Sequence, residues 1–371
     1  MPSASFQRCR RCVMDTSDPE IVFDSDGVCN HCHFHDQIRS RYILPAGERE
    51  KALEQRIRRV KAEGRGKKYD CIIGLSGGVD SSYIALKVKE LGLRPLAVHM
   101  DGGWNSELAV SNIENIVDRL GIDLFTNVVE WDEMRDLQLS FFRSGVPNCD
   151  IPQDHAIIAV LLKAANAFGV RTIVRGLNIA TESVLPQAWG YSAIDLRHIK
   201  AIHKKYGQVK LKTFPTCSIL ELAYYYAFKK ITYYDILNNL EYDKDKAKEL
   251  ITAELGWRDY GGKHHESLFT KFFQSYYLVK KFGFDKRLAH YSSLVLAGSM
   301  TRDQALVALE KPPYDDDRMH LELNFVANKM EIEVVELERI IASPPRRHTE
   351  FPSYKSLLFS DWATRIRKFL K

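Results

Sequence analysis

The sequence predicts an α/β protein built on a doubly wound parallel sheet. Two observations carry this prediction. Short apolar runs alternate with helical patterns through the middle of the chain, and a glycine- and serine-rich turn joins the first of these runs to a helix. With 371 residues, of which 45% are hydrophobic, the chain is long enough to bury a large core and to form more than one domain.

Residues 1–45 are predicted to form a zinc-binding module. Cys9 and Cys12 form one CxxC pair, Cys29 and Cys32 form a second, and sixteen residues separate the pairs. Four thiolates in this pattern are typical of one tetrahedral, structural Zn²⁺. The alternatives are a disulfide or redox pair, or a histidine (His31, His33 or His35) in place of one cysteine. We expect a cytoplasmic protein, because the sequence shows no signal peptide and no membrane-spanning run, and a reducing compartment favours zinc.

Residues 46–68 are predicted to be a basic helix, over 47–63, and a linker. Residues 69–200 hold the predicted parallel sheet. Its strands are expected at 70–75, 95–100, 124–129 and 172–175, with helices near 81–90, 106–120, 134–143 and 154–168. Ligands of such sheets bind beyond the carboxyl ends of the strands.

Residues 201–371 are predicted to be an α-helical substrate or assembly region. The expected helices are 220–229, 233–240, 243–255, 266–282, 285–297, 301–309, 320–330 and 333–343.

The turn after the first strand is predicted to bind a phosphate. Gly77 and Gly78 let backbone N–H groups approach an anion at a helix start. A carboxylate there repels phosphate unless a cation lies between them, so Asp80 is interpreted as a Mg²⁺ ligand. The alternative is an ordinary strand-to-helix turn. The expected nucleotide-binding residues of this turn are Ser76, Gly77, Gly78, Val79, Ser81 and Ser82.

The string Ser-Gly-Gly-Val-Asp-Ser-Ser at 76–82 resembles the loop of the PP-loop ATP pyrophosphatases, whose fold is HUP-like. The resemblance implies that ATP is cleaved between its α and β phosphates and that a carbonyl oxygen is adenylated. It further implies that His99 and Met100 border the adenine. Gly176 would belong to a second loop that closes on the α-phosphate, with Arg175 stabilising charge in the adenylating step.

Three other segments carry candidate residues. The loop at 145–155 offers Cys149 as a nucleophile, although Asp154 also suits a helix N-cap. The basic run at 196–212 is either a solvated face or a site for a second acidic ligand. The segment at 257–267 offers Lys263, His264 and Glu266, with capping of a helix as the equal alternative.

The whole pattern resembles the N-acetyl sugar amidotransferases of bacterial surface-polysaccharide and lipopolysaccharide O-antigen biosynthesis. The resemblance rests on the four-cysteine segment with Met14-Asp15-Thr16, on 74–82, on 98–105 and on 262–267. It implies a ligase that uses ATP, Mg²⁺ and Zn²⁺ to convert an acetamido group of a nucleotide-linked sugar into an acetamidino group, with Asp80, Arg175 and Lys263 as catalytic residues. No glutaminase signature is present, so ammonia is expected from a separate class I glutaminase subunit.

Two alternatives remain open from the sequence. A PP-loop tRNA sulfurtransferase would use Cys149 and Cys217 to relay sulfur, but a net charge of only +5 makes nucleic acid an unexpected partner. A non-enzymatic zinc- and ATP-binding module would bind ATP without releasing pyrophosphate.

Overall fold

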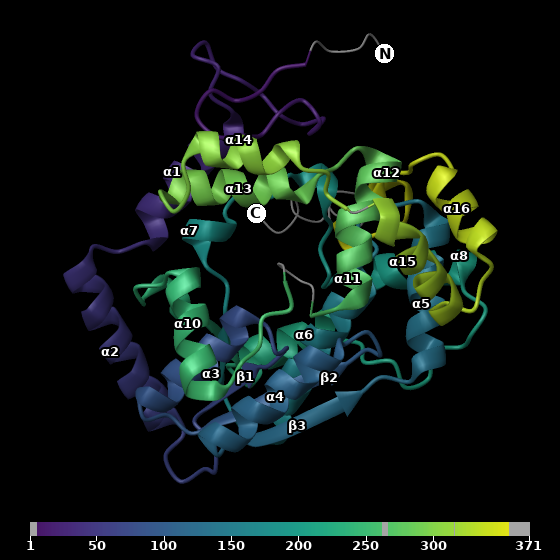
Figure 1. Ribbon diagram of the computed structural model, residues 1–371. Coiled ribbons are helices and arrows are strands. Elements are labelled where there is room, and N and C mark those ends of the chain that lie inside the picture. The colour runs from purple at the N-terminus through teal and green to yellow at the C-terminus, as the bar shows by residue number, and fades with distance from the viewer. Residues whose placement is uncertain (1–5, 262–265, 315, 356–371) are drawn as a thin grey trace, which may run out of the picture.

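The computed structural model describes residues 6–261, 266–314 and 316–355. Five parallel strands form one sheet in the order β3-β2-β1-β4-β5. Figure 1 labels three of them, β1, β2 and β3. The strands are β1 (Cys71–Gly74), β2 (Pro95–Asp101), β3 (Asp123–Val128), β4 (Thr172–Arg175) and β5 (Thr232–Asp235). The strand order reverses direction between β1 and β4, which confirms the doubly wound sheet and creates a crevice between the ends of these two strands.

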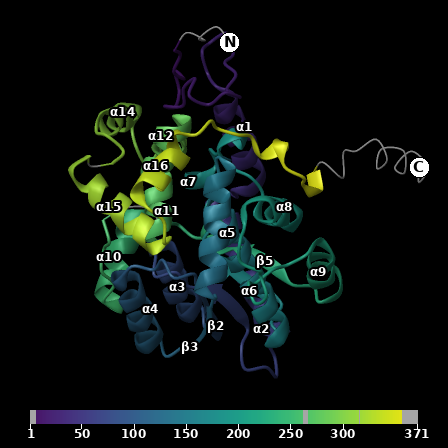
Figure 2. The same ribbon diagram turned by 90° about the vertical axis from the view of Figure 1, so that its right-hand side faces the viewer.

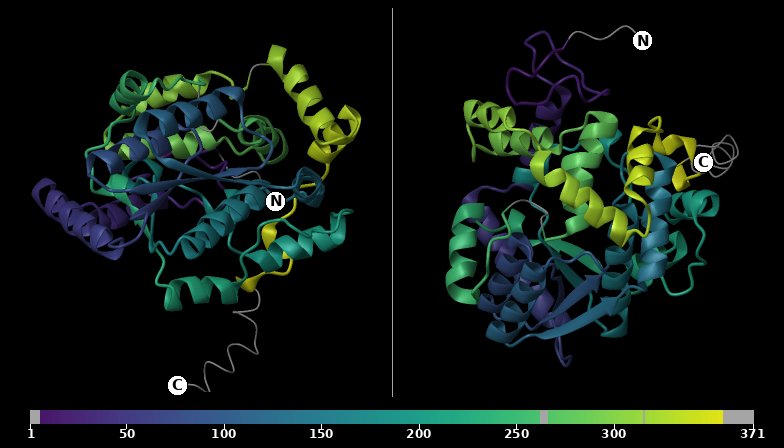
Figure 3. Two further views of the ribbon diagram at one scale, coloured as in Figure 1. Left: turned by 90° about the horizontal axis from the view of Figure 1, so that it is seen from below. Right: turned by 45° about the vertical axis from the view of Figure 1, so that its right-hand side comes forward.

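Helices cover both faces of the sheet (Figure 3). One layer contains α3 (Val79–Glu90), α4 (Glu107–Leu120) and α10 (Lys244–Leu255), and the other contains α6 (Ile151–Ala167) and α9 (Ile219–Ala223). Successive strand residues point to opposite faces, so Cys71 and Ile73 pack in the first layer and Ile72 packs in the second.

The fifth strand corrects one prediction. The segment 233–240 was expected to be helical, but Thr232–Asp235 forms β5 and pairs with β4. A β-branched residue followed by two tyrosines favours an extended chain once a strand edge is available. The sheet therefore includes a strand from beyond residue 200, inside the region predicted to be all helical.

Most of the remaining helices form a second body beside the sheet (Figure 2). Its core contains buried aromatic side chains such as Phe142, Phe269 and Tyr277. They are α1 (Asn30–Tyr42), α5 (Trp131–Ser144), α7 (Ile179–Glu182), α8 (Leu196–Tyr206), α11 (Leu268–Phe272), α12 (Leu278–Phe282), α13 (Lys286–Ala297), α14 (Arg302–Glu310), α15 (Asp316–Lys329) and α16 (Val334–Ala342). Helix α2 (Ala46–Glu63) instead packs Ile57 and Val60 in the first layer on the sheet. Among the described residues, no helix is both long enough and apolar enough to cross a bilayer.

The N-terminal module lies against α13 and α14 at the end of the molecule away from the sheet (Figure 1). The Arg302 guanidinium donates to the backbone carbonyls of Cys9 and Cys12, at 2.9 and 3.0 Å. The backbone N–H of Val13 donates to Ser292 Oγ at 3.2 Å. These contacts tie the cysteine segment to helices almost 300 residues later in the chain.

Candidate active site

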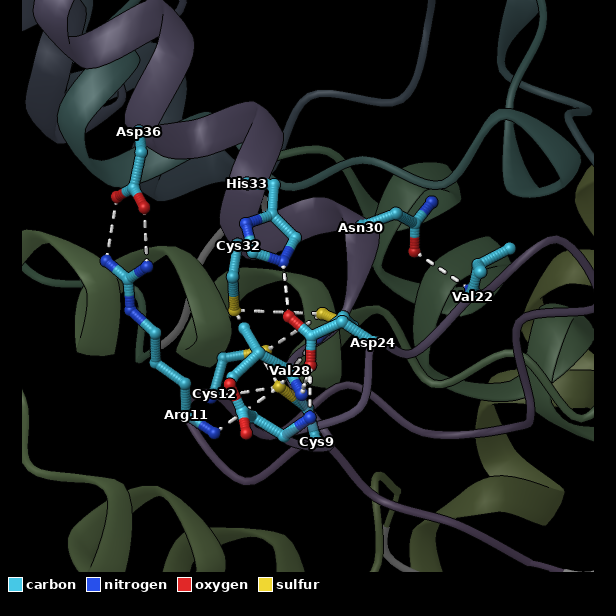
Figure 4. A network of polar contacts seen from close by, with 12 residues as sticks. Cys9, Arg11, Cys12, Val22, Asp24, Val28, Asn30, Cys32, His33 and Asp36 are labelled. Carbon is cyan, nitrogen blue, oxygen red and sulfur yellow. Dashed lines mark hydrogen bonds and ion pairs between the residues drawn. The ribbon is translucent and has the colours of Figure 1, made fainter.

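The four N-terminal cysteines form one buried cluster (Figure 4). Their Sγ atoms all lie within 4.8 Å of one another, and the closest pairs are 3.6–3.7 Å apart. Sulfurs bound at about 2.3 Å to one tetrahedral Zn²⁺ would lie about 3.8 Å apart, whereas a disulfide needs about 2.05 Å. The cluster is therefore compatible with zinc, and the donor set leaves no position for water.

Backbone and side-chain contacts support this interpretation of the cluster. The N–H groups of Arg11, Cys12 and Cys29 point at Cys9 Sγ at 3.3–3.4 Å, which stabilises negative sulfur. The nearby histidines have other partners, since His31 pairs with Asp18 at 2.7 Å and His33 pairs with Asp24 at 2.8 Å. No histidine of the described residues joins the sulfur cluster.

The loop after β1 has the shape expected of an anion cradle. Gly77 has φ +76°, and α3 begins at Val79 directly after the extended Gly78. Ser82 Oγ donates to the Gly78 carbonyl at 2.7 Å, while the hydroxyls of Ser76 and Ser81 lie 3.2 Å apart. The Gly78 N–H donates to Ser76 Oγ at 3.3 Å, so the glycines and serine hydroxyls of this loop lie together at the start of α3, and phosphate binding there stays a prediction.

Replacing Gly77 by alanine should abolish ATP binding. A Cβ there would lie 2.4 Å from the Ala109 carbonyl oxygen, so the loop backbone would have to move. Gly121→Ala is the matched control, because Gly121 also has positive φ (+56°) but a Cβ added to it would point into open space. The control should lose only about 1 kcal/mol of stability and keep ATP affinity. Calorimetric titration with ATP checks both variants, and equal affinities would contradict a role for this loop.

The loops after β1 and β4 meet at the crevice between these strands. A Cβ on Gly176 would lie 3.2 Å from Asp80 Cβ, so the glycine permits the close approach. The Tyr242 hydroxyl contacts the Asp80 carboxylate. The burial of Tyr242 and the charge of Asp80 raise the pKa of this tyrosine well above its usual range, so it stays a hydrogen-bond donor. Asp80 is accordingly held in place at the start of α3.

Arg175 lies at the end of β4 in a different environment from the one expected. Its guanidinium makes two hydrogen bonds to the Asp235 carboxylate, at 2.8 and 3.0 Å, and lies 4.3 Å from the centre of the Tyr233 ring. Its role in charge stabilisation stays a prediction, and it would require Arg175 to leave the Asp235 pair.

His99 and Met100 lie at the end of β2, on the wall of the cavity beside the Ser76 loop. The His99 Nδ1–H donates to the Leu75 carbonyl at 2.8 Å, and Nε2 accepts from the Asn105 amide at 3.0 Å. His99 therefore links the ends of β1 and β2 and orients Asn105.

One cavity of about 1450 Å³ extends from this sheet edge to the C-terminal segment. Ser76, His99 and Met100 form its wall at the sheet, and Pro19 and Glu20 of the N-terminal module also line it. A single small ligand commonly occupies about 300–1000 Å³. The cavity is thus large enough for ATP together with a second substrate.

The structure brings residues of the helical region to the phosphate loop. The Trp257 indole N–H donates to the Gly77 carbonyl at 2.8 Å. A Cβ on Gly78 would lie 3.4 Å from Glu266 Oε1 and 3.3 Å from the Tyr260 hydroxyl. Glu266 thus lies beside the phosphate loop, and its contribution to the active site stays a prediction. Lys263 and His264 lie outside the described residues.

Asp150 is a site residue that the sequence did not single out. It lines the cavity although it is only 8% exposed, and the Thr270 hydroxyl donates to its carboxyl at 3.1 Å. Burial raises the pKa of the Asp150 carboxyl from 3.8 to about 7, and the charge of Asp154 adds to this rise. A carboxyl that titrates near neutral pH on a cavity wall is suited to accept or donate a proton.

The structure corrects the interpretation of Asp154 as a helix N-cap and argues against Cys149 as a nucleophile. Helix α6 begins at Ile151 with Asp150 in the N-cap position, so Asp154 lies inside the first turn and is not the N-cap. Cys149 is fully buried, and burial raises the pKa of its thiol well above the usual range. A buried neutral thiol is a poor nucleophile.

The basic run at 196–212 is not part of the cavity wall. It forms α8 and the turn after it, where His203 Nε2 lies 2.9 Å from an Asp136 oxygen on α5. Among the described residues, the lysines and arginines that line the cavity come instead from the C-terminal third of the chain: Lys286, Arg346, Arg347 and Lys355.

Residues 266–367 match the family described as LPS biosynthesis protein WbpG-like, C-terminal domain. A protein of Methanocaldococcus jannaschii, the uncharacterized protein MJ1599, is 23% identical over 82% of this chain and 94% of its own length. The tRNA-specific 2-thiouridylase MnmA of Hahella chejuensis is 35% identical over 28% of this chain and 32% of its own.

Two solved structures are similar to this chain at a low level. NMN synthetase from Francisella tularensis is 14% identical, with a TM-score of 0.29, over 61% of this chain and 90% of its own. The NH3-dependent NAD synthetase from Campylobacter jejuni is 13% identical, with a TM-score of 0.29, over 56% of this chain and 93% of its own length. Because this similarity is low, the assignment of the fold is based on the strand order of this chain and not on these two structures.

Proposed function

We propose that this protein is an ATP-dependent amidotransferase that converts the acetamido group of a nucleotide-linked sugar into an acetamidino group. The observation that carries the proposal is the single cavity. It joins Ser76, the first residue of the Ser-Gly-Gly-Val-Asp-Ser-Ser loop, to a wall that includes residues of the segment that matches a lipopolysaccharide-biosynthesis family. ATP at one end and an N-acetyl sugar at the other end account for its volume.

The reaction has two steps. The amide oxygen attacks the α-phosphorus of ATP, pyrophosphate leaves, and ammonia then attacks the activated carbon, loses a proton and displaces AMP. The N–H groups of Gly77 and Gly78 would orient the phosphates, with His99 and Met100 beside the base. Asp80, with Glu266 nearby, would hold Mg²⁺, which neutralises phosphate charge. Asp150 would take the proton from the attacking nitrogen.

The direct test supplies the purified protein with ATP, Mg²⁺, an ammonium salt and a panel of nucleotide-linked N-acetyl sugars. The expected products are AMP, pyrophosphate and a sugar in which an NH group replaces one oxygen, identified by its mass. With glutamine as the nitrogen source, activity should require a class I glutaminase subunit. Absence of AMP formation with every sugar would contradict the proposal.

A tRNA sulfurtransferase is the second candidate, favoured by the local similarity to the 2-thiouridylase. Its two expected sulfur carriers, Cys149 and Cys217, are fully buried, which opposes this candidate. Cys149→Ser should therefore keep most of its activity with ammonium, because no thiol chemistry is needed. Loss of all activity in this variant, together with stimulation of AMP release by tRNA, would favour the sulfurtransferase.

Asp150 predicts a specific dependence of stability on pH. An acid whose pKa rises on folding contributes stability that is complete below its unfolded pKa of 3.8 and is lost as the pH rises through about 7. Asp150→Asn removes this dependence. The variant should thus gain stability over the native protein between about pH 4 and pH 8, by on the order of 4 kcal/mol at the upper end.

Thermal unfolding of both proteins across this pH range measures the difference. A constant difference in melting temperature at all pH values would show that Asp150 does not titrate in this range. The same variant should lose activity with ammonium while keeping its affinity for ATP, because Asp150 is assigned to the second step only.

A further inference from the structure

The wall of the cavity at the C-terminal segment combines aromatic rings with cations. Tyr191 and His348 line this wall, and so do Arg347 and Lys355. Arg347 and Lys355 are exposed, whereas Tyr191 is half-buried. The C-terminal part of this wall lies within the residues that match the lipopolysaccharide family.

The aromatic part of the wall is held rigidly. The Tyr191 ring stacks on the His348 ring, with centres 4.9 Å apart and an angle of 20° between planes. The Tyr191 hydroxyl donates to an Asp195 oxygen at 2.9 Å. The same Asp195 oxygen accepts from the Tyr354 backbone N–H at 2.9 Å, which ties the C-terminal segment to this ring.

The imidazoles behind Tyr191 are neutral. The His348 Nε2 accepts from the Asn148 backbone N–H at 3.2 Å, so His348 Nδ1 carries the hydrogen and donates to His198 Nε2 at 3.0 Å. Burial lowers the pKa of His348 to about 3 and that of His198 to about 4. Tyr191 therefore rests on an uncharged support, and the positive charge of the wall comes from its cations.

We propose that this wall binds the nucleoside diphosphate part of the nucleotide-linked substrate. Tyr191 offers a flat ring on which a nucleobase can stack, and Arg347 and Lys355 offer charge to a diphosphate. The sugar then lies in the middle of the cavity, with its acetamido group toward the Ser76 loop and Asp150. The inference rests on the proposed function, and it assigns the substrate's diphosphate to Arg347 and Lys355, whereas no residue of the basic run at 196–212 lines the cavity.

The test measures binding and requires no turnover. The protein is saturated with Mg²⁺ and a non-hydrolysable ATP analogue, and UDP, CDP, GDP and dTDP are titrated by calorimetry. At least one should bind, and Arg347→Ala and Lys355→Ala should each weaken that binding about tenfold. Lys204→Ala, an exposed cation of α8 off the cavity wall, should leave the affinity unchanged.

A second comparison separates the ring from the cations. Tyr191→Leu should lower the affinity for the nucleoside diphosphate but not for inorganic pyrophosphate. Arg347→Ala should lower the affinity for both ligands. The proposal is overturned if none of the four diphosphates binds, or if the variants bind as the native protein does. Diphosphate binding without amidination of any sugar would instead reject the proposed function and keep this site. If the variants amidinate the sugar with an unchanged KM for the nucleotide-linked substrate, the proposed nucleotide site is rejected and the proposed function is kept.

Discussion

Asp80→Asn should reduce the formation of AMP and pyrophosphate by on the order of 100-fold or more. The substitution removes the negative charge that would hold Mg²⁺ but keeps an oxygen that can accept from Tyr242. The fold should survive, because Asp80 lies in the first turn of α3 at the edge of the sheet. Initial rates at saturating ATP, measured with and without added Mg²⁺, check this result.

Asp303→Asn is the matched control for the Asp80 variant. Asp303 is an exposed carboxylate in the first turn of α14, so its loss removes the same helix-dipole interaction without touching the cavity. We expect native rates and a stability change below about 1 kcal/mol. Wild-type turnover in Asp80→Asn would reject the metal-ligand role and, with it, the interpretation of the 76–82 loop as an ATP pyrophosphatase loop.

Cys12→Ser should remove about one Zn²⁺ per chain and destabilise the whole helical body. The large effect follows from the position of the cluster, because Cys9 and Cys12 accept hydrogen bonds from Arg302 through their carbonyls. Pro19 and Glu20 lie between the two CxxC pairs and line the cavity, so activity should also fall. Metal analysis and thermal unfolding of protein purified without chelator measure both effects.

Cys217→Ser is the control, since Cys217 is also fully buried but lies outside the cluster. It should keep the native zinc content. Arg302→Ala should retain zinc but unfold at a lower temperature, because it loosens only the contact with α14. Native protein without stoichiometric zinc would contradict the assignment of the cluster.

The sequence alone was sufficient for features that depend on local spacing. The CxxC pairs predicted the cysteine cluster because two residues between cysteines let both thiols of a pair face one point. The strands β1 to β4 were predicted within one or two residues. Buried strands such as β1 and β4 are continuous apolar runs between helical patterns, although the edge strand β3 is largely exposed. The positive φ of Gly77 likewise follows from the glycine in a tight strand-to-helix turn.

The tertiary structure decided what depends on contacts between distant segments. Thr232–Asp235 became a strand because the free edge of β4 offered hydrogen bonds that a single sequence does not show. Asp150 has a raised pKa because α6 and α11 enclose it, and no local pattern reports burial. The C-terminal cations reach the cavity, whereas the conspicuous basic run does not, because charge density along a chain says nothing about which surface the folded chain presents to a ligand.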